Sequence, residues 1–416
     1  MATDTKPAVH PRAATVMADL FGGALEDPFP AYNELRELGD GVHWSEQLQA
    51  YLVCRYDDVR FLGSDHRRFS SDVFYDSAPS WHDNTNPEHL RFVDTASLLF
   101  MFSDPPTHTR IRSSFRHVFT PRSIAQWETT IRKVTEDLIS RYSRGREFDI
   151  MPGFAADVPV AIIASILGVP DEARAKFREW SYGFASTFDP VVQGDMRDTA
   201  IAASLELFEY LRSLIDERSV APKDDLISEL IRTETVSGDR LQDIELVAQL
   251  ALLLVAGNET TTSLIGSGLT YLLEHPTTLA EVRADPDMLP VAIEEILRLD
   301  PPLHLALRKT TEETRFGNTV VPAGAILAPC LAAANRDPRR FDAPNEFDIH
   351  RSDNKHLAFY NGIHFCVGAP LGRLEVRVVL RYILDNFPEL RLGSAPAQRR
   401  TNNAVARGWA SRPVVL

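Results

Sequence analysis

The sequence predicts a mainly helical protein, with one large helical body and a smaller β-rich region, for three reasons. Helical spacing of apolar residues dominates from about 105 to 300 and is interrupted only by scattered prolines. Alternating β-branched and aromatic residues are concentrated at 41–56 and 315–332. The residues after Pro388 indicate further short strands. This order of elements is typical of a helical fold with a minor sheet.

Length and charge limit the domain organisation and the partners. A chain of 416 residues without a linker-like segment is expected to form one domain over 21–416, preceded by a flexible N-terminal arm over 1–20. The net charge of −14 argues against nucleic acid as a partner, because phosphate binding needs a basic surface.

The cysteines and the apolar segments indicate the compartment. Cys54, Cys330 and Cys366 have neither the number nor the spacing of a disulfide framework or a zinc site. The N-terminal segment lacks the apolar core of a secretory signal, and the longest apolar run, 246–256, is too short to cross a membrane. We therefore expect a cytoplasmic protein without a membrane partner.

The N-terminal part of the chain contains small elements. The turn-like sequence EDPFP introduces a short helix over 30–38, the alternating residues 41–56 predict a hairpin, and DDVRFLG at 57–63 predicts another short helix. From 74 to 102, polar residues and prolines occur without periodicity before the apolar SLLFMF. This stretch predicts a loop-rich segment over a pocket.

A long helix without proline is predicted over 242–273, with Asp243 and Glu245 at its positive end. At 1.5 Å per residue it would extend about 48 Å and cross the molecule. Its middle, AGNETTT at 256–262, contains a glycine, three threonines and two polar residues that suit a buried helix poorly. Such a local mismatch indicates a functional site.

Cys366 lies in HLAFYNGIHFCVG at 356–368, directly before a helix predicted to end at Pro388. Free N–H groups and the dipole at a helix N-terminus favour a thiolate, the form that binds iron. Gly362 and Gly368 allow the backbone to approach a flat ligand, and Phe359 is placed to shield the sulfur from water. Spacing alone equally allows Cys366 to be a small buried apolar residue.

The residues around this cysteine resemble the haem-thiolate signature of the cytochrome P450 superfamily: Phe359, Gly362, His364, Cys366 and Gly368. One position departs from it, because Tyr360 stands where members usually carry glycine. The resemblance runs from DPPTHTR at 104–110 to the helix after the cysteine. It implies the superfamily's fold in its soluble bacterial type, a haem b (iron protoporphyrin IX) cofactor, and Cys366 as the iron ligand.

The segment AGNETT at 256–261 resembles the oxygen-activating motif of the same superfamily. The resemblance implies that Thr260 stabilises the oxygen being activated and that Glu259 relays protons. An acid, a hydroxyl group and an opened helical turn that holds water suit proton delivery in a dry pocket. The alternative is that Thr260 merely bonds a carbonyl of its own helix.

Glu295 and Arg298 match the superfamily's Glu-x-x-Arg motif, whose side chains form a buried ion pair one helical turn apart, and Arg351 is the expected third member. Their role would be structural. Without the resemblance, the pair is equally typical of a solvated helix face. The resemblance also assigns cations to the two haem carboxylates: His108, Arg112, Arg308 and His364.

Arginines recur every four residues along the helix after the cysteine and form one face, a local reversal of charge in an acidic protein. We predict that this face docks an acidic ferredoxin-type electron donor. The predicted docking face consists of Arg110, Arg116, Arg132, Arg373, Arg377 and Arg381. The alternative is an ordinary solvated basic face.

The positions that line the substrate pocket in the superfamily are mostly apolar in this chain, and they predict a medium-sized hydrophobic substrate. They are Leu98, Leu99, Phe184, Phe188, Leu253, Ala256, Leu303, His304, Leu305 and Val405. His304 either bonds a hydroxyl or carboxylate of the substrate or is a satisfied histidine at the pocket edge.

We therefore expect a monooxygenase that inserts one oxygen atom from O2 by hydroxylation, epoxidation or dealkylation, with electrons from NAD(P)H through a ferredoxin and its reductase. The alternatives are a peroxide-driven or oxidative-coupling haem enzyme and a non-catalytic haem-bearing binding protein. The presence of both Glu259 and Thr260 argues against a peroxide-driven enzyme, because peroxide already carries reduced oxygen.

Overall fold

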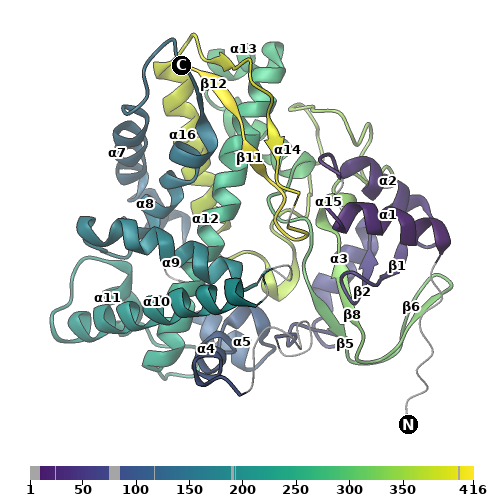
Figure 1. Cartoon of the computed structure of the whole chain (residues 1–416), viewed down its shortest axis with the longest axis horizontal. Helices are drawn as coiled ribbons and strands as arrows, with labels where there is room; N and C mark the ends of the chain where they lie inside the picture. Colours follow the sequence, from purple (N-terminus) through teal and green to yellow (C-terminus); the bar gives the residue numbers. More distant parts are fainter. Residues whose placement is uncertain are drawn as a thin grey trace.

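The computed structural model describes residues 10–416, apart from 24, 75–84, 117, 189–191, 193 and 402. A large helical body occupies one side, and a β-rich region with a few helices occupies the other (Figure 1). This arrangement confirms the predicted mainly helical class with a smaller β region. The described helices of the body are α4 (Pro87–Ala96), α5 (Thr107–Ser113), α6 (Pro121–Ala125), α7 (Glu128–Ile139), α8 (Asp157–Ile166), α9 (Arg174–Ser186), α10 (Asp195–Val220), α11 (Leu226–Arg232), α12 (Asp243–Glu274), α13 (Pro276–Ala284), α14 (Met288–Leu299) and α16 (Ala369–Asn386).

The β-rich region is built on a five-stranded sheet in the order β1-β2-β8-β5-β3. Its strands are β1 (Val42–Ser45), β2 (Ala50–Val53), β3 (Phe69–Ser70), β5 (Arg308–Thr310) and β8 (Ile326–Pro329). β1 and β2 form the predicted hairpin, and β2 continues the sheet by pairing in parallel with β8. The sheet therefore joins the N-terminal part of the chain to residues far along the sequence.

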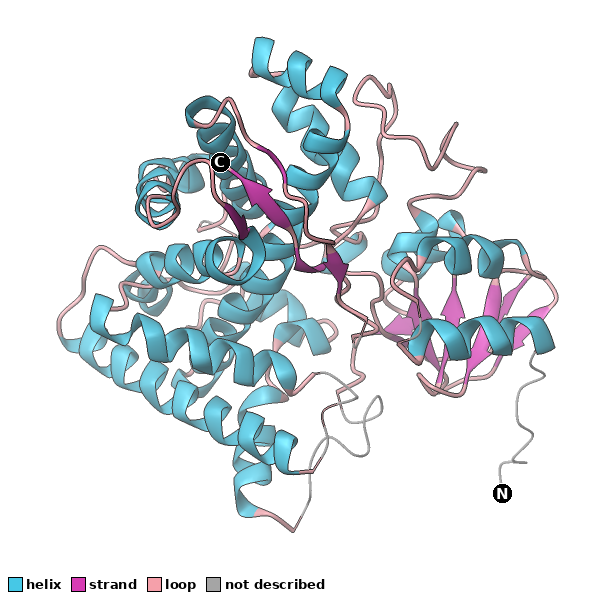
Figure 2. Cartoon of the chain, turned by 45° about the horizontal axis from the view of Figure 1, so that its top comes forward, coloured by secondary structure: helices cyan, strands magenta, loops and turns pink. Residues whose placement is uncertain are grey.

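Alternation along the strands gives this sheet two buried faces. Leu52 packs with α1 (Pro11–Phe21) and α2 (Phe29–Glu37), whereas its neighbour Tyr51 packs with α3 (Tyr56–Ser64). Figure 2 shows helices lying across the strands of this sheet. Because both faces are covered, the register of these strands is fixed by burial.

The predicted flexible arm is wrong from Pro11 onward, because these residues form α1. Ala13, Val16, Met17 and Leu20 recur at helical spacing and are buried against α2 and the sheet. A proline in the first turn suits a helix start, since its missing N–H would have no partner there. Residues 1–9 of the predicted arm lie outside the described residues.

The predicted loop-rich segment 74–102 also contains regular structure. Its helix α4 begins after Asn86, whose side chain accepts a hydrogen bond from the Glu88 N–H at 2.9 Å. A short turn, η1 (Phe100–Phe102), follows, while 75–84 lie outside the described residues.

In the helical body, sequence reasoning also missed β4 (Glu147–Asp149), which pairs with β12 (Pro413–Val415) near the C-terminus.

Helix α12 lies at the centre of the helical body and packs against α8, α10 and α16 (Figure 1). Gln242 and Glu245 form a capping box at its start, with the Gln242 N–H donating to Glu245 at 2.9 Å. The helix is continuous through 256–262, so the predicted opened turn is not observed. Within the described residues, no helix is both long and apolar enough to cross a membrane.

The remaining strands follow the predicted order. The hairpin β6 (Thr314–Phe316) and β7 (Thr319–Val321) lies within the strand-like stretch 315–332, and the C-terminal tail contains β9 (Arg391–Leu392), β10 (Gln398–Arg399), β11 (Trp409–Ser411) and β12. Between them, α15 (Leu331–Ala334) and the cysteine loop connect the sheet to α16.

Candidate functional site

The cysteine loop is held against α3 by a close backbone approach. A Cβ added to Gly362 would lie 1.8 Å from the Gly63 carbonyl oxygen, and Gly362 has φ +71°. Only glycine satisfies both conditions. The Cys366 N–H donates to the Phe359 carbonyl at 3.0 Å, and the chain then enters α16 at Ala369. The loop thus presents Cys366 at the start of α16, as the sequence predicts.

Cys366 keeps an accessible surface within the loop. Burial raises the pKa of its thiol, while the N–H groups of Gly368 and Ala369 and the charge of Arg112 act in the opposite direction. The N–H groups at the start of α16 thus favour the thiolate, as the sequence predicts, while burial opposes it. An accessible sulfur in desolvating surroundings is suited to a ligand that enters the protein interior and binds the sulfur itself.

Two histidines and two arginines converge near this cysteine from three parts of the chain: His108 and Arg112 from α5, Arg308 from β5, and His364 from the loop. The His108 and His364 rings lie 4.2 Å apart. Among the described residues, both ring nitrogens of His108, Nε2 of His364 and Nη2 of Arg308 are buried without a hydrogen-bond partner. Buried polar atoms are rarely left unpaired, so this cluster is suited to an anionic ligand.

Both histidines are electrically neutral in these surroundings. Burial, with the positive charge of Arg112 as a second cause, lowers the pKa of His108 to about 4. Burial and then the charge of Arg308 lower the pKa of His364 to about 2. The arginines therefore supply the positive charge, and the histidines supply neutral N–H donors.

Tyr360, the departure from the superfamily signature, has φ +56°, in the left-handed region that favours glycine. A residue other than glycine costs about 1–2 kcal/mol there. The tyrosine ring is buried, and the Arg308 guanidinium lies 4.7 Å from its centroid. Burial and the cation–π contact offset the backbone cost, and the ring supports one of the converging arginines.

The segment predicted to activate oxygen lies on α12, where Asn258, Glu259 and Thr260 each have a partner within the protein. The Thr260 hydroxyl donates to the Ala256 carbonyl at 2.6 Å, so the alternative interpretation of this threonine describes the structure. Asn258 donates to the Ser181 hydroxyl at 3.2 Å, and Glu259 pairs with Arg400 at 3.3 Å. Sequence reasoning missed Arg400, because it lies far from Glu259 along the chain.

A buried carboxyl group on α16 faces the same part of α12. Glu375 contacts Thr261, and burial raises the pKa of its carboxyl to about 8.

Sequence reasoning also missed the role of Gln249, which is fully buried on α12. It donates to the Leu98 carbonyl at 2.8 Å and accepts from the Phe100 N–H at 3.1 Å, so it fixes this segment against α12. Its only sequence signal is that it interrupts an apolar run.

The structure brings Glu295, Arg298 and Arg351 together in one buried network. Arg298 donates to both carboxylate oxygens of Glu295 at 2.7 and 2.8 Å, and Arg351 lies 3.3 Å from the same carboxylate. Arg298 also donates to three carbonyls between 335 and 346. The network ties α14 to the chain that leads into the cysteine loop.

Several predicted substrate residues keep accessible surface, as lining of a pocket requires: Leu98, Phe188, Ala256, Leu303 and Val405. Leu253 is buried in the main core. Phe188 belongs to a run of aromatic contacts in which it lies 6.0 Å from Phe102 and 5.2 Å from Phe184. Phe184 and Leu99 have no exposed surface. Their predicted contact with substrate is corrected to packing in the main core.

The structure favours the alternative in which His304 is bonded within the protein, and it contradicts the predicted substrate contact of Leu305. His304 is fully buried and its Nδ1 lies 3.1 Å from the Tyr32 hydroxyl, beside Phe29. Burial lowers the pKa of this histidine to about 3. Leu305 packs in the cluster under α1 and α2. Because α1 and α2 cover the sheet, both residues lie in the core. The local sequence around residues 304 and 305 does not indicate this burial.

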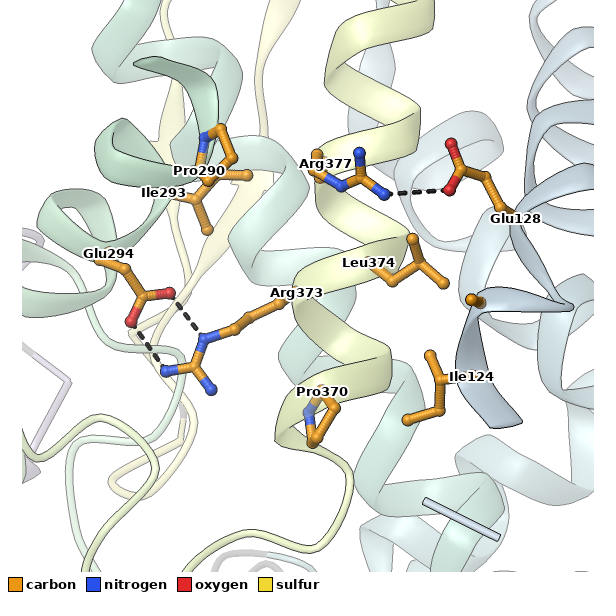
Figure 3. A pocket seen from close by; sticks show the side chains of 10 residues that line it. Ile124, Glu128, Pro290, Ile293, Glu294, Pro370, Arg373, Leu374 and Arg377 are labelled. Carbon is orange, nitrogen blue, oxygen red and sulfur yellow. Dashed lines mark hydrogen bonds and ion pairs between the residues drawn. The ribbon is translucent and has the colours of Figure 1, made fainter. Parts of the chain in front are cut away.

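The predicted docking arginines are largely paired with acids. Arg373 binds Glu294 through two hydrogen bonds of 2.7 Å, and Arg377 lies 3.1 Å from Glu128, on the two sides of α16 (Figure 3). These pairs border a groove of about 340 Å³ lined by apolar residues, which include Ile124, Pro290, Ile293, Pro370 and Leu374.

The other four predicted docking arginines differ in their surroundings. Arg381 pairs with Asp385, whereas Arg116 is exposed and Arg132 is exposed over the Tyr382 ring. Arg110 pairs with Asp239 and Glu245 at the start of α12. The structure therefore separates Arg110 from the face of α16.

Comparison with known proteins supports the same site. The family model of cytochrome P450 matches residues 82–404. The cytochrome P450 monooxygenase PikC of Streptomyces venezuelae is 38% identical over 395 residues, covering 93% of this chain and 91% of that protein. Cytochrome P450 107B1 of Saccharopolyspora erythraea is 37% identical over 380 residues, covering 88% and 89%. The solved structure of the Bacillus subtilis bacillaene polyketide synthase cytochrome P450 PksS has a TM-score of 0.84 at 34% identity, covering 94% and 97%.

The fold and the site define a haem-thiolate oxidoreductase. The chain belongs to the cytochrome P450 family, whose members bind haem b, and it is a P450 monooxygenase. The accessible cysteine and the unpartnered donors around it fit that cofactor, since haem carries two carboxylates.

Proposed function

We propose that this monooxygenase inserts one oxygen atom from O2 into a medium-sized hydrophobic small molecule, by hydroxylation, epoxidation or dealkylation. The electrons come from NAD(P)H through a ferredoxin and its reductase, and the second oxygen atom leaves as water. The observation that supports this proposal most is the accessible Cys366 beside the buried, unpartnered donors of His108, His364 and Arg308.

Haem, when bound, supplies the binding and activation of O2. In our assignment Cys366 ligates its iron, and Arg112 and Arg308 with the two neutral histidines hold its carboxylates. From α12, Thr260 would supply a hydroxyl group and Glu259 would relay protons. Thr260 must exchange its bond to Ala256 to act in this way.

The substrate class rests on the accessible residues Leu98, Phe188, Leu303 and Val405, which are all apolar. An apolar lining with few polar groups binds through burial of hydrophobic surface. The name of PksS links that relative to polyketide biosynthesis, and this is the compound class that we would screen first.

The first experiment records the absorption spectrum of the dithionite-reduced protein under carbon monoxide. We expect the red-shifted band from which the family takes its name, and its loss in Cys366→Ser but not in Cys54→Ala. Substrate-induced shifts of the ferric spectrum then identify ligands. Turnover with NADH, a ferredoxin and its reductase should yield an oxygenated product that carries ¹⁸O from ¹⁸O2.

Two results would favour the alternatives. Product formation with hydrogen peroxide but not with NADH and redox partners would indicate a peroxide-driven or oxidative-coupling enzyme. Ligand binding without turnover by either route would indicate a haem-bearing binding protein.

We also retain the cytoplasm as the proposed compartment, because the three cysteines are free thiols.

We further propose that an acidic electron donor docks on the face formed by Arg116, Arg132, Arg373, Arg377 and Arg381. Acidic groups of the donor would compete with Glu294 and Glu128 for Arg373 and Arg377. Arg377→Glu should slow reduction several-fold and weaken its salt dependence, whereas Arg315→Glu on β6 serves as the matched control. Equal reduction rates in the two variants would refute this docking face.

A further inference from the structure

The C-terminal hairpin of β10 and β11 packs along one face of α12, the face that begins at Glu259. A Cβ added to Gly408 would lie 2.2 Å from the Ser263 hydroxyl, and one added to Gly266 would lie 3.3 Å from the Trp409 ring. Glu259, Ser263 and Gly266 are spaced at i, i+4 and i+7, so they share a face of the helix. The hairpin therefore contacts the same face that carries Glu259.

Arg399 and the buried Arg407 fix the hairpin in this position. Arg399 donates to the carboxylate of buried Asp300 at 2.8 and 3.1 Å, and Asp300 also accepts from Ser267 of α12 at 2.6 Å. Arg407 donates to the carbonyls of Leu20 and Leu25 at 3.0 and 2.5 Å, near the end of α1. The segment between these two arginines is thus held at both ends.

Arg400 lies between Arg399 and Arg407 in the sequence, and its own contact is longer and more exposed to solvent than the Arg399 contact. Arg400 directly follows β10, and its side chain contacts Glu259 rather than Asp300. A single contact of 3.3 Å joins Arg400 to Glu259, and both side chains are about one quarter exposed, at 27% and 26%. This partly hydrated contact can exchange partners, whereas the buried Arg399 pair cannot do so at low cost.

We propose that Arg400 is the positioning residue of Glu259 and holds its carboxylate in one orientation beside Thr260. The inference rests on the proposed function, since orientation of this acid matters only if it relays protons. The neighbouring motif side chains are already bound, Asn258 to Ser181 and Thr260 to Ala256. Arg400 is therefore the group that determines where the carboxylate points in the resting protein.

The same loop connects the acid to the proposed substrate side. Val405 follows Arg400 in the segment fixed by Arg399 and Arg407, and its carbonyl accepts a hydrogen bond from the His304 N–H at 2.8 Å. Because the Arg400 charge is the group that contacts the Glu259 carboxylate, its removal should disturb proton delivery without removing the acid itself.

The test compares Arg400→Gln, Arg400→Lys and the control Arg391→Gln on exposed strand β9, all in haem-loaded protein. The first readout is carbodiimide labelling of the Glu259 carboxylate, measured by mass spectrometry, which needs no turnover. An exposed ion pair predicts that Arg400→Gln raises the labelling rate by about two- to five-fold. Arg400→Lys should restore most of the wild-type rate, and Arg391→Gln should leave it unchanged.

The second readout is the amount of product formed per NADH consumed, with its solvent isotope effect. Arg400→Gln should lower this ratio by a similar factor and change the isotope effect, and Arg400→Lys should recover both. Wild-type labelling and coupling in Arg400→Gln would overturn the positioning role. Absence of product in the wild type would instead refute the proposed function, and the labelling rates would still decide whether Arg400 positions Glu259.

Discussion

The cysteine side of the site and the α12 side differ in how their polar groups are satisfied. Near Cys366, His108, His364 and Arg308 keep buried atoms without partners in the described structure. On α12, Thr260 is bonded to Ala256, and Glu259 is bonded to Arg400. One side is prepared for a ligand that supplies the missing partners, whereas Thr260 and Glu259 on the other side already have partners within the protein, although Asn258 Oδ1 and Thr262 Oγ1 beside them have none among the described residues.

This difference indicates two kinds of functional residue. Groups that bind a permanent cofactor are oriented by the fold and remain unsatisfied until the cofactor binds, which makes its binding favourable. Groups that move protons must change partners during each cycle, so they rest in contacts that can be exchanged. Mutations on the two sides should therefore affect different measurements.

The largest effect is expected in the network that supports the cysteine loop. Glu295→Gln leaves the buried Arg298 charge uncompensated and should lower the free energy of unfolding by about 3–5 kcal/mol. Glu294→Gln, one residue earlier, weakens the contacts of a carboxylate that is 31% exposed with Arg373 and His356, and should cost less, about 2 kcal/mol for the two pairs. Urea unfolding of the haem-loaded proteins measures both. Equal losses would mean that burial does not distinguish the two pairs.

The next effect concerns Glu375, which lies between the two sides. Its folded-state pKa of about 8 exceeds the ordinary value of 4.5, so the folded protein keeps a proton that the unfolded chain has lost. Stability should therefore fall as pH rises through this window, by up to about 1.4 kcal/mol per pH unit. Glu375→Gln should remove this part of the slope, as measured by urea unfolding at several pH values. An unchanged slope would show that another group carries it.

Arg308→Gln tests the cysteine side by haem retention. Loss of a charged hydrogen bond should speed haem transfer to an acceptor apoprotein by about tenfold or more. Lys309→Gln, the next residue of β5, is the matched control because alternation directs its side chain to the other face. Similar transfer rates in both variants would argue against Arg308 as a carboxylate partner.

The smallest effect is expected for Thr260→Ala on the α12 side. Without the hydroxyl, the amount of product formed per NADH should fall by about three- to tenfold, the factor that corresponds to the free energy of one hydrogen bond. Thr260→Ser keeps the hydroxyl and should preserve most of the coupling. Haem transfer should be unchanged in both variants, and faster transfer in Thr260→Ala would remove the distinction between the two sides.

The sequence by itself determined the class of the fold and the identities of the motif residues. Periodicity located α12 and α16, since a buried helix needs apolar residues at fixed spacing. The residues around Cys366 indicated haem through their resemblance to the haem-thiolate signature, whereas spacing alone left a buried apolar cysteine equally possible. Periodicity also indicates α1, whose buried residues follow the same rule, although the expected flexible arm overlooked it.

Only the tertiary structure decided which partner each side chain has. Arg400 meets Glu259, and His304 meets Tyr32, across 141 and 272 residues of chain, separations at which spacing carries no information. The same holds for Tyr360, whose positive φ is tolerated because the folded chain buries its ring under Arg308. Packing, burial and the closing of long loops determine such contacts, and these depend on the whole fold.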